Sequence, residues 1–240
     1  MKITKETKLI GIAGVAHSGK NEVAKMIDYI QISSNPNFEL YKEATKYTYF
    51  PMIYEFESFA NKLKSILCNL YNIPRNYLEV TEYKENYYYV FDKNIVISKD
   101  ELSKEYFIYD VPCPFNVSLS KYLNIQNKKI AIKLRSLMQY FGTDVIRNNL
   151  GEDVWVNACI NCVNINKRYG TSTIITDVRF PNEAKAVKDN NGILIKVVRN
   201  NEIDNNHESE KIDFDTDITI MNNGSLENLF NNVKEIIDKE

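Results

Sequence analysis

The chain has 240 residues, of which 44% are hydrophobic and 26% are charged, and this length fits one α/β domain with an insertion or two small domains. The formal net charge of −2 is unlike the basic footprint of most nucleic-acid-binding proteins, so we expect no nucleic-acid partner. No apolar run is long enough to cross a bilayer, and residues 1–6 lack the apolar core of a signal peptide, so we expect a cytoplasmic protein without a membrane partner.

The first half of the chain begins with a strand and helix pattern. Residues 8–14 form a short apolar run ending in glycine, which predicts a strand buried on both faces. Residues 21–32 repeat apolar side chains with a helical period. A second strand is predicted at 53–60, and a helix follows at 62–70.

The middle of the chain has a different composition. Residues 83–120 are rich in tyrosine and charge and include short alternating stretches, which favours an insertion with a small hairpin inside a single domain spanning 1–240. Helices are predicted to return at 129–141 and 153–167.

The last third predicts strands at 172–178, 192–198 and 217–221, with a short helix at 182–188 between the first two. A final amphipathic helix begins after Ser225, which suits the N-cap position. This alternation of strands and helices predicts an α/β fold with a mostly parallel sheet covered on both faces.

The four cysteines are Cys68, Cys113, Cys159 and Cys162. The last two form a Cys-x-x-Cys pair, but neither a second pair nor a nearby histidine completes a four-ligand zinc set. Residues 154–160 read as a buried helix face. We therefore expect these thiols to pack as small hydrophobic groups, with a metal or redox role as the alternative.

A phosphate-binding loop is the strongest single motif. Residues 14–20 read Gly-Val-Ala-His-Ser-Gly-Lys and lie between the first predicted strand and helix. Glycines let successive N–H groups wrap an anion, the helix N-terminus adds its positive end, and the lysine reaches the outer phosphates. The alternative is a glycine-rich turn with an exposed lysine. The expected nucleotide contacts are Gly14, Ala16, His17, Ser18, Gly19 and Lys20, with His17 alternatively a solvated loop residue.

The position after the lysine departs from the usual loop. A serine or threonine normally stands there and its hydroxyl holds Mg²⁺, whereas this chain has Asn21 followed by Glu22. The Asn21 amide oxygen could bind the ion directly or through water. We therefore assign Asn21 as a candidate metal ligand and group Asn21 and Glu22 with the nucleotide-binding residues.

A second constellation lies at the end of the predicted strand 172–178. Asp177 and Arg179 should face the same crevice as the loop, because ligands gather at the carboxyl ends of parallel strands. Asp177 could position Mg²⁺ or hold the acceptor, Arg179 could neutralise a phosphate, and Glu183 could orient Arg179. The alternative is a structural ion pair that caps a helix.

Further cations are available for a phosphate clamp. Phosphoryl transfer needs much positive charge around the transferred group, and Arg135 and Arg147 are candidates, each alternatively a solvated helix residue. Arg199, which ends the strand 192–198, is a further candidate nucleotide contact.

Taken together, these segments resemble the deoxynucleoside monophosphate kinases of tailed bacteriophages. The resemblance follows the chain in order through the motifs Gly14 to Lys20, Ser58 to Lys64, Lys84-Glu85, Leu134 to Thr143, Arg147, Asp153, Trp155, Asp177 to Glu183, His207 to Glu210, and Asn222 to Ser225. The loop and the Asp-Val-Arg-Phe-Pro-Asn-Glu block are its most specific parts. The residues Asn21-Glu22 replace the Asp-Thr that usually follows the lysine in this family.

The resemblance implies a P-loop kinase fold, with a five-stranded parallel sheet in the order 2-3-1-4-5 and mobile acceptor and lid regions that include the insertion. It implies transfer of the γ-phosphoryl of ATP to a deoxynucleoside monophosphate with Mg²⁺, for DNA precursor synthesis, in the host cytoplasm if a phage encodes the chain. A homodimer is left open. The catalytic or substrate-binding residues implied are Lys20, Arg135, Asp177, Arg179 and Glu183, with Lys62, Lys64 and Lys84 on the acceptor side and His207 and Glu210 near the nucleotide.

Other enzyme classes fit less well. A motor or helicase would place a second acid after Asp177, where Val178 stands, and the Asn-Lys-x-Asp motif of a GTPase is broken by Lys64. A zinc hydrolase reading of His207 fails because Lys211 replaces the second histidine. Two alternatives stay open, a P-loop kinase of another small acceptor (a nucleoside or coenzyme precursor) and a non-catalytic nucleotide-binding protein.

Overall fold

The computed structural model describes residues 2–15, 17–46, 52–102, 106–109, 129–199 and 212–237. The chain divides into two compact units. The first unit comprises Met1–Phe59 and Val156–Glu240, and the second comprises Ala60–Trp155. The predicted insertion at 83–120 falls inside the second unit.

The first unit alternates strands and helices as the sequence predicts. Its elements are β1 (Leu9–Ala13), α1 (Lys20–Ile32), α2 (Phe38–Ala44), β2 (Tyr54–Glu57), α9 (Val154–Arg168, of which Val154 and Trp155 belong to the second unit), β7 (Ser172–Val178), α10 (Pro181–Asp189), β8 (Ile193–Val198), β9 (Ile218–Met221) and α11 (Leu226–Glu235). The predicted N-cap at Ser225 is confirmed, because its hydroxyl accepts the Asn228 N–H. The helix α2 has no counterpart in the sequence prediction.

The sheet of the first unit has five parallel strands in the order β2-β7-β1-β8-β9. The chain-wide numbering reads 2-7-1-8-9 rather than 2-3-1-4-5 because four strands of a separate sheet come between β2 and β7. Counted among themselves, the five strands run 2-3-1-4-5. The central place of β1 puts the segment that follows it in the middle of one sheet edge.

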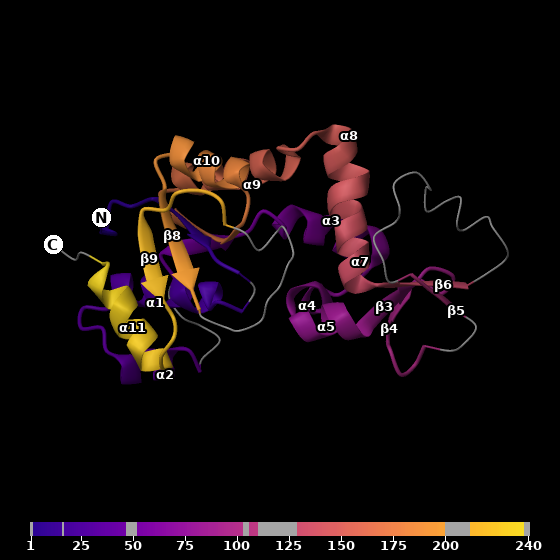
Figure 1. Ribbon diagram of the computed structural model, residues 1–240, viewed down its shortest axis with the longest axis horizontal. Coiled ribbons are helices and arrows are strands. Elements are labelled where there is room, and N and C mark those ends of the chain that lie inside the picture. The colour runs from indigo at the N-terminus through magenta and orange to yellow at the C-terminus, as the bar shows by residue number, and fades with distance from the viewer. Residues whose placement is uncertain are drawn as a thin grey trace. The chain divides into compact units, whose positions relative to one another are not determined.

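Helices cover both faces of this sheet (Figure 1). One hydrophobic cluster joins α1, α2 and α11 to side chains such as Ile10 and Ile12 of β1. A second cluster joins α9 and α10 to the opposite face, which includes Leu9 and Ala13. Alternate residues of β1 therefore enter different clusters, which explains why the whole strand is apolar.

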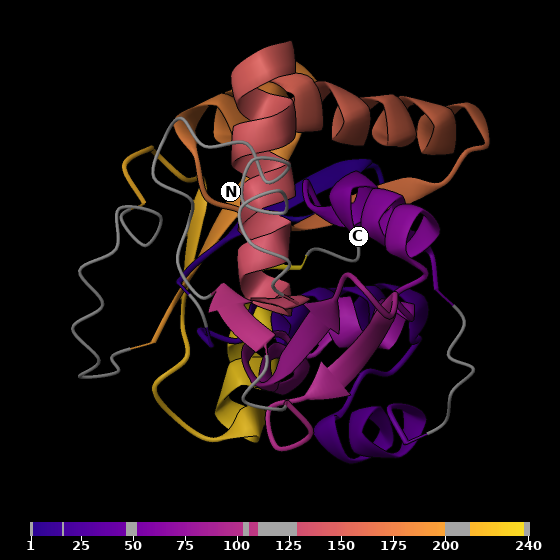
Figure 2. The same cartoon turned by 90° about the vertical axis from the view of Figure 1, so that its right-hand side faces the viewer.

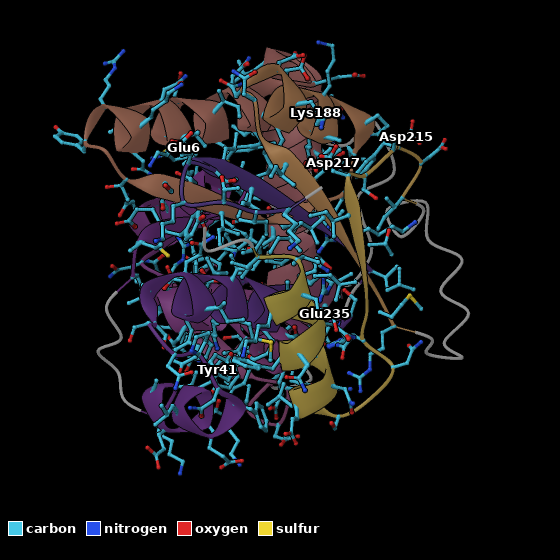
Figure 3. The ribbon with its side chains drawn as sticks, turned by 90° about the vertical axis from the view of Figure 1, so that its left-hand side faces the viewer. Glu6, Tyr41, Lys188, Asp215, Asp217 and Glu235 are labelled. Atoms are coloured by element: carbon cyan, nitrogen blue, oxygen red, sulfur yellow. The ribbon has the colours of Figure 1, made fainter. Side chains whose placement is uncertain are left out.

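Two sets of contacts connect separate segments of the first unit. Asp217, just before β9, accepts hydrogen bonds from Lys188 Nζ of α10 at 2.7 and 2.8 Å and from the Leu194 N–H at 2.8 Å (Figure 3). Near the chain ends, Ile3 and Ile237 form a parallel β-bridge, and both side chains are buried. The first and last described segments are therefore neighbours.

The second unit combines short helices with a four-stranded sheet (Figure 2). The strand order is β4-β3-β6-β5, with β3 antiparallel to both β4 and β6, and β5 parallel to β6. The pair β3–β4 is the hairpin expected within the insertion. The elements are α3 (Asn61–Tyr71), α4 (Arg75–Glu79), α5 (Thr81–Asn86), β3 (Tyr87–Val90), β4 (Ile95–Ser98), β5 (Tyr106–Tyr109), β6 (Lys129–Lys133), α7 (Leu134–Gln139), the π-helix η1 (Tyr140–Arg147) and α8 (Asn148–Leu150).

The predicted helix at 129–141 is wrong in its first five residues. Lys129–Lys133 forms β6, and the helix begins only at Leu134. Ala131 packs into one cluster with Tyr88, while Ile132 packs into another with Tyr89. Successive side chains thus face opposite sides of the sheet, which is the period of a strand. Pairing with β3 and β5 on its two sides fixes β6 as a strand.

No helix among the residues that the structure describes is long and apolar enough to span a membrane.

Candidate functional site

Three adjacent strands of the first unit end at one edge of its sheet. β1 lies between β7 and β8 and runs parallel to both, so their carboxyl ends coincide. The loop at 14–20 follows β1, Asp177 lies at the end of β7, and Arg199 follows β8. Open α/β sheets bind ligands outside this edge. The predicted adjacency of the loop strand and the Asp177 strand is confirmed.

The loop between β1 and α1 contains two residues with left-handed backbone. His17 has φ 61° and an exposed side chain, and Gly19 has φ 100°. The Lys20 ammonium donates to the carbonyl oxygens of Gly14 and Val15, both at 2.7 Å. Its side chain therefore folds back over the loop, where the ammonium can reach a phosphate held by the loop.

The interior of the loop is tightly filled and polar. A Cβ atom on Gly14 would lie 2.5 Å from Ser18 Oγ and 2.8 Å from the Val197 carbonyl oxygen, so a larger residue does not fit. The Ser18 side chain is fully buried, and its hydroxyl has no hydrogen-bond partner among the described residues. An unpaired buried hydroxyl costs about 1–3 kcal/mol, and an oxyanion inside the loop would satisfy it. Ala16 lies outside the described residues.

Asn222, in the turn after β9, contacts the loop from a distant part of the chain. Its side-chain amide donates a hydrogen bond to the Ser18 carbonyl oxygen at 2.8 Å. In the sequence, Asn222 stands out only as the first residue of a motif, Asn222 to Ser225, that carries the family resemblance. Because 204 positions separate the two residues, no local pattern indicates this contact.

The start of α1 presents the residues that replace the usual metal-binding hydroxyl. Asn21 is exposed. The Glu22 carboxylate accepts a hydrogen bond from the Tyr41 hydroxyl of α2 at 2.6 Å and pairs with Lys25 at 3.8 Å. Burial, reinforced by Glu22, raises the pKa of Tyr41. These contacts direct Glu22 towards α2, and its contact with the nucleotide stays a prediction.

Asp177 and Arg179 leave β7 at the same edge as the loop. Asp177 Oδ1 accepts the Phe59 N–H at 2.9 Å, so the carboxylate also fixes the segment that follows β2. The Arg179 side chain is exposed. The two side chains therefore differ in environment. The Asp177 carboxylate is partly buried and accepts a backbone N–H, whereas the Arg179 guanidinium is exposed and accessible to a ligand.

The Glu183 carboxylate binds the backbone at Arg179. One carboxylate oxygen, Oε2, accepts the N–H groups of Arg179 at 2.7 Å and Phe180 at 3.0 Å. Pro181 opens α10, and Glu183 sits in its first turn, so the carboxylate caps the helix. Burial raises the pKa of Glu183 to about 7, with a further upward contribution from Asp177.

The Cys-x-x-Cys pair, Cys159 and Cys162, lies on α9. Cys159 is buried in the cluster beneath α9, as the packing interpretation expects. Burial raises the pKa of its thiol, and the charges of Asp177 and Glu57 raise it further. Nucleophilic and metal-binding cysteines react as thiolates, so this environment does not favour either role for Cys159. Cys113 lies outside the described residues.

The remaining predicted cations belong to the second unit. Arg135, on α7, pairs with Glu85 of α5, and Lys133 lies 3.7 Å from the same carboxylate. Arg147 is the last residue of η1. Lys64 pairs with Glu79 at 2.6 Å. The predicted acceptor-side residues Lys62 and Lys84 also lie in this unit, on α3 and α5.

Two further predictions concern ligands at the nucleotide edge. His207 and Glu210 lie outside the described residues. Within the described ranges, no group of three or more His, Cys, Asp or Glu side chains could hold a metal ion by itself. Asn21 and Asp177 remain the candidate metal ligands, and a nucleotide's phosphates would have to supply further oxygens.

The sequence of the chain matches a known protein family. The model of the deoxynucleotide monophosphate kinase family matches residues 8–233, a span that runs from β1 to the last helix. No curated protein matches the chain. The match includes the loop after β1, the Asp177–Glu183 block and the whole second unit. The chain therefore belongs to the deoxynucleotide monophosphate kinase family, whose members are phosphotransferases that act on deoxynucleoside monophosphates.

Proposed function

We propose that this kinase transfers the γ-phosphoryl group of ATP to a deoxynucleoside 5′-monophosphate and so supplies deoxynucleoside diphosphates for DNA synthesis. A phosphate oxygen of the acceptor attacks the γ-phosphorus, the bond to the bridging β–γ oxygen breaks, and ADP leaves with its electron pair. A cytoplasmic location, in the host if a phage encodes the enzyme, is part of the same proposal.

The loop at 14–20 carries the proposal. Its buried, unpaired Ser18 hydroxyl and the crowding at Gly14 fit a loop that closes around an oxyanion. Lys20 would move from the loop carbonyls to the β- and γ-phosphate oxygens, where its positive charge offsets the charge that builds up during transfer. Backbone N–H groups at the start of α1 would hold the same phosphates.

The other predicted residues would act on the transferred group and the acceptor. The exposed guanidinium of Arg179, held by Glu183 through its backbone, is suited to the transferred phosphoryl. Arg199 would contact the nucleotide at the end of β8. In the second unit, Arg135 and Arg147 are the candidates for the phosphate clamp, and Glu85 holds Arg135 in place.

Mg²⁺ would be held by the nucleotide phosphates together with Asn21, Asp177 or both. An amide oxygen and a carboxylate are ligands of the hard-oxygen class that Mg²⁺ prefers. When bound, the ion would neutralise charge on the phosphates during transfer.

A coupled assay of ADP formation against a panel of deoxynucleoside and ribonucleoside monophosphates, nucleosides and coenzyme precursors tests the proposal. We expect ADP to form only with a nucleoside monophosphate and with Mg²⁺ present. Lys20→Ala should lower kcat by a hundredfold or more, because losing a transition-state charge contact costs about 3–4 kcal/mol. The melting temperature should stay close to that of the wild type.

Lys25→Ala is the matched control. Lys25 lies on the same helix but is exposed and pairs with the Glu22 carboxylate at 3.8 Å, so turnover should be retained. Wild-type turnover by a folded Lys20→Ala protein would overturn the loop assignment. Full activity in excess chelator would overturn the role of Mg²⁺, and ATP binding without turnover on any acceptor would identify a non-catalytic nucleotide-binding protein.

A further inference from the structure

Asn222 joins two segments of the sheet edge where the nucleotide would bind. Its backbone N–H donates to the Val198 carbonyl oxygen at 2.7 Å, and its side-chain Nδ2 donates to the Ser18 carbonyl oxygen at 2.8 Å. The side chain is almost fully buried, with 9% of its surface exposed. The end of β9 thus reaches past β8 and holds the loop that follows β1.

This contact determines how the peptide between Ser18 and Gly19 is turned. A trans peptide is planar, so its carbonyl and its N–H point in opposite directions. With the Ser18 carbonyl bound to Asn222, the Gly19 N–H points away from Asn222. Gly19 has φ 100° and ψ 15°, and a glycine can adopt several other backbone conformations at little cost. An external contact is therefore needed to fix one of them.

The space at Gly19 supports the same reading. A Cβ atom there would lie 2.5 Å from Asn222 Nδ2. Any other residue would displace the amide as well as strain the backbone. The close approach of Asn222 and the left-handed backbone of Gly19 therefore depend on each other.

We propose that Asn222 is a positioning residue that holds the Ser18–Gly19 peptide with its N–H directed at the phosphates of ATP. This inference rests on the proposed function of the loop. Asn222 does not touch the reacting atoms; it orders a backbone donor that does. Its effect should therefore fall on phosphate binding and leave acceptor binding unchanged.

The test compares Asn222→Ala and Asn222→Asp with the wild type. Asn222→Ala removes the donor, and Asn222→Asp keeps the shape but turns a carboxylate oxygen towards the Ser18 carbonyl. We expect the Kd for ATP, measured by calorimetry, to rise about tenfold in the first and further in the second, as for loss of a buried hydrogen bond. The KM for the deoxynucleoside monophosphate should stay within about twofold.

Two further measurements separate a phosphate-directed role from others. Inorganic tripolyphosphate, used as a competitor of ATP, should lose affinity by the same factor as ATP, because it has no base or sugar. Asn232→Ala is the control, since the Asn232 amide donates to the neighbouring Met221 carbonyl at 3.0 Å without reaching the loop. Its Kd for ATP should equal that of the wild type.

The outcomes distinguish this inference from the proposed function. If the wild type does not bind ATP, the proposed function fails. If the wild type binds and Asn222→Ala binds equally well, or only melts at a lower temperature, Asn222 has a structural role and the inference alone fails. A rise in Kd for ATP with unchanged tripolyphosphate affinity would assign Asn222 to the base or sugar and also overturn it.

Discussion

Glu183 is a buried carboxylate that has backbone donors but also a neighbouring acid, Asp177. Its pKa is raised from 4.5 to about 7, chiefly by burial. The folded protein therefore holds this proton more tightly than the unfolded chain does. Raising the pH from about 4.5 through 7 removes stability, and the loss is complete above the folded-state pKa. The shift corresponds to about 3 kcal/mol.

Replacing Glu183 with glutamine should remove this pH dependence. Both backbone N–H groups donate to the same oxygen, Oε2, and the carbonyl oxygen of an amide can accept two hydrogen bonds. We expect Glu183→Gln to gain stability relative to the wild type as the pH rises from 5 to 8.5, by up to about 3 kcal/mol. Urea unfolding followed by far-ultraviolet circular dichroism at several pH values measures it.

Glu227→Gln provides the control, because Glu227 also lies in the first turn of a helix but is exposed. The difference in unfolding free energy between Glu227→Gln and the wild type should not rise with pH as it does for Glu183→Gln. The kcat of Glu183→Gln should stay within about threefold of the wild type if Glu183 acts only through the backbone of Arg179. A loss of a hundredfold or more would show that the ionised carboxylate takes part directly.

At the scale of elements, sequence patterns predict those whose surroundings are symmetrical. The apolar run of β1 and the helix of α1 survive in the structure, where β1 is buried on both faces and the second half of α1, from Met26 to Gln31, is buried on all sides. The strand β6 was missed because Lys129–Lys133 leads directly into the amphipathic α7. Only pairing with β3 and β5, which both lie well before β6 in the sequence, determines that these residues are extended.

The candidate site divides in the same way. The residues of the loop and of the Asp177–Glu183 block follow one another in sequence, and their chemistry could be predicted from type and order. The contacts made by Asn222 and by Tyr41 on Glu22 could not, because they join residues that only the folded sheet brings together. The Glu183 carboxylate accepts the Arg179 backbone N–H, and this contact depends on where α10 begins, which the sequence alone does not determine.

A core substitution tests the central position of β6. Ile132 is fully buried between β3 and the helices of the second unit, whereas Ile108 on the edge strand β5 is 46% exposed. Ile132→Ala should cost about 2–5 kcal/mol of unfolding free energy, and Ile108→Ala less than about 0.5 kcal/mol. Urea unfolding followed by tryptophan fluorescence compares them. Equal, small effects would mean that β6 does not form a core strand.

At the scale of the whole molecule, each unit has hydrophobic clusters of its own. The only tryptophan of the chain, Trp155, belongs to the second unit, where its indole N–H donates to the Gly142 carbonyl oxygen at 2.8 Å. We expect the two units to unfold separately, so that fluorescence and circular dichroism give transitions that do not coincide.

Paired variants sharpen this expectation. Ile132→Ala, in the second unit, should move the fluorescence transition. Ile195→Ala, at a fully buried position of β8 in the first unit, should move only the part of the dichroism transition that fluorescence does not report. Coincident curves for both probes, shifted alike by both variants, would instead identify one cooperative unit.

The bridge between Ile3 and Ile237 makes the described chain nearly a closed ring. The first unit is interrupted in sequence by the second, so Gly11 of β1 must find Ile175 of β7 across the whole of Ala60–Trp155. If a short linker joined the two ends of the chain and the chain were opened between Phe59 and Ala60, the residues of the first unit would follow one another in sequence without interruption. Such a circular permutant would lower the contact order of the parallel sheet, and loop-closure entropy would then favour its faster assembly.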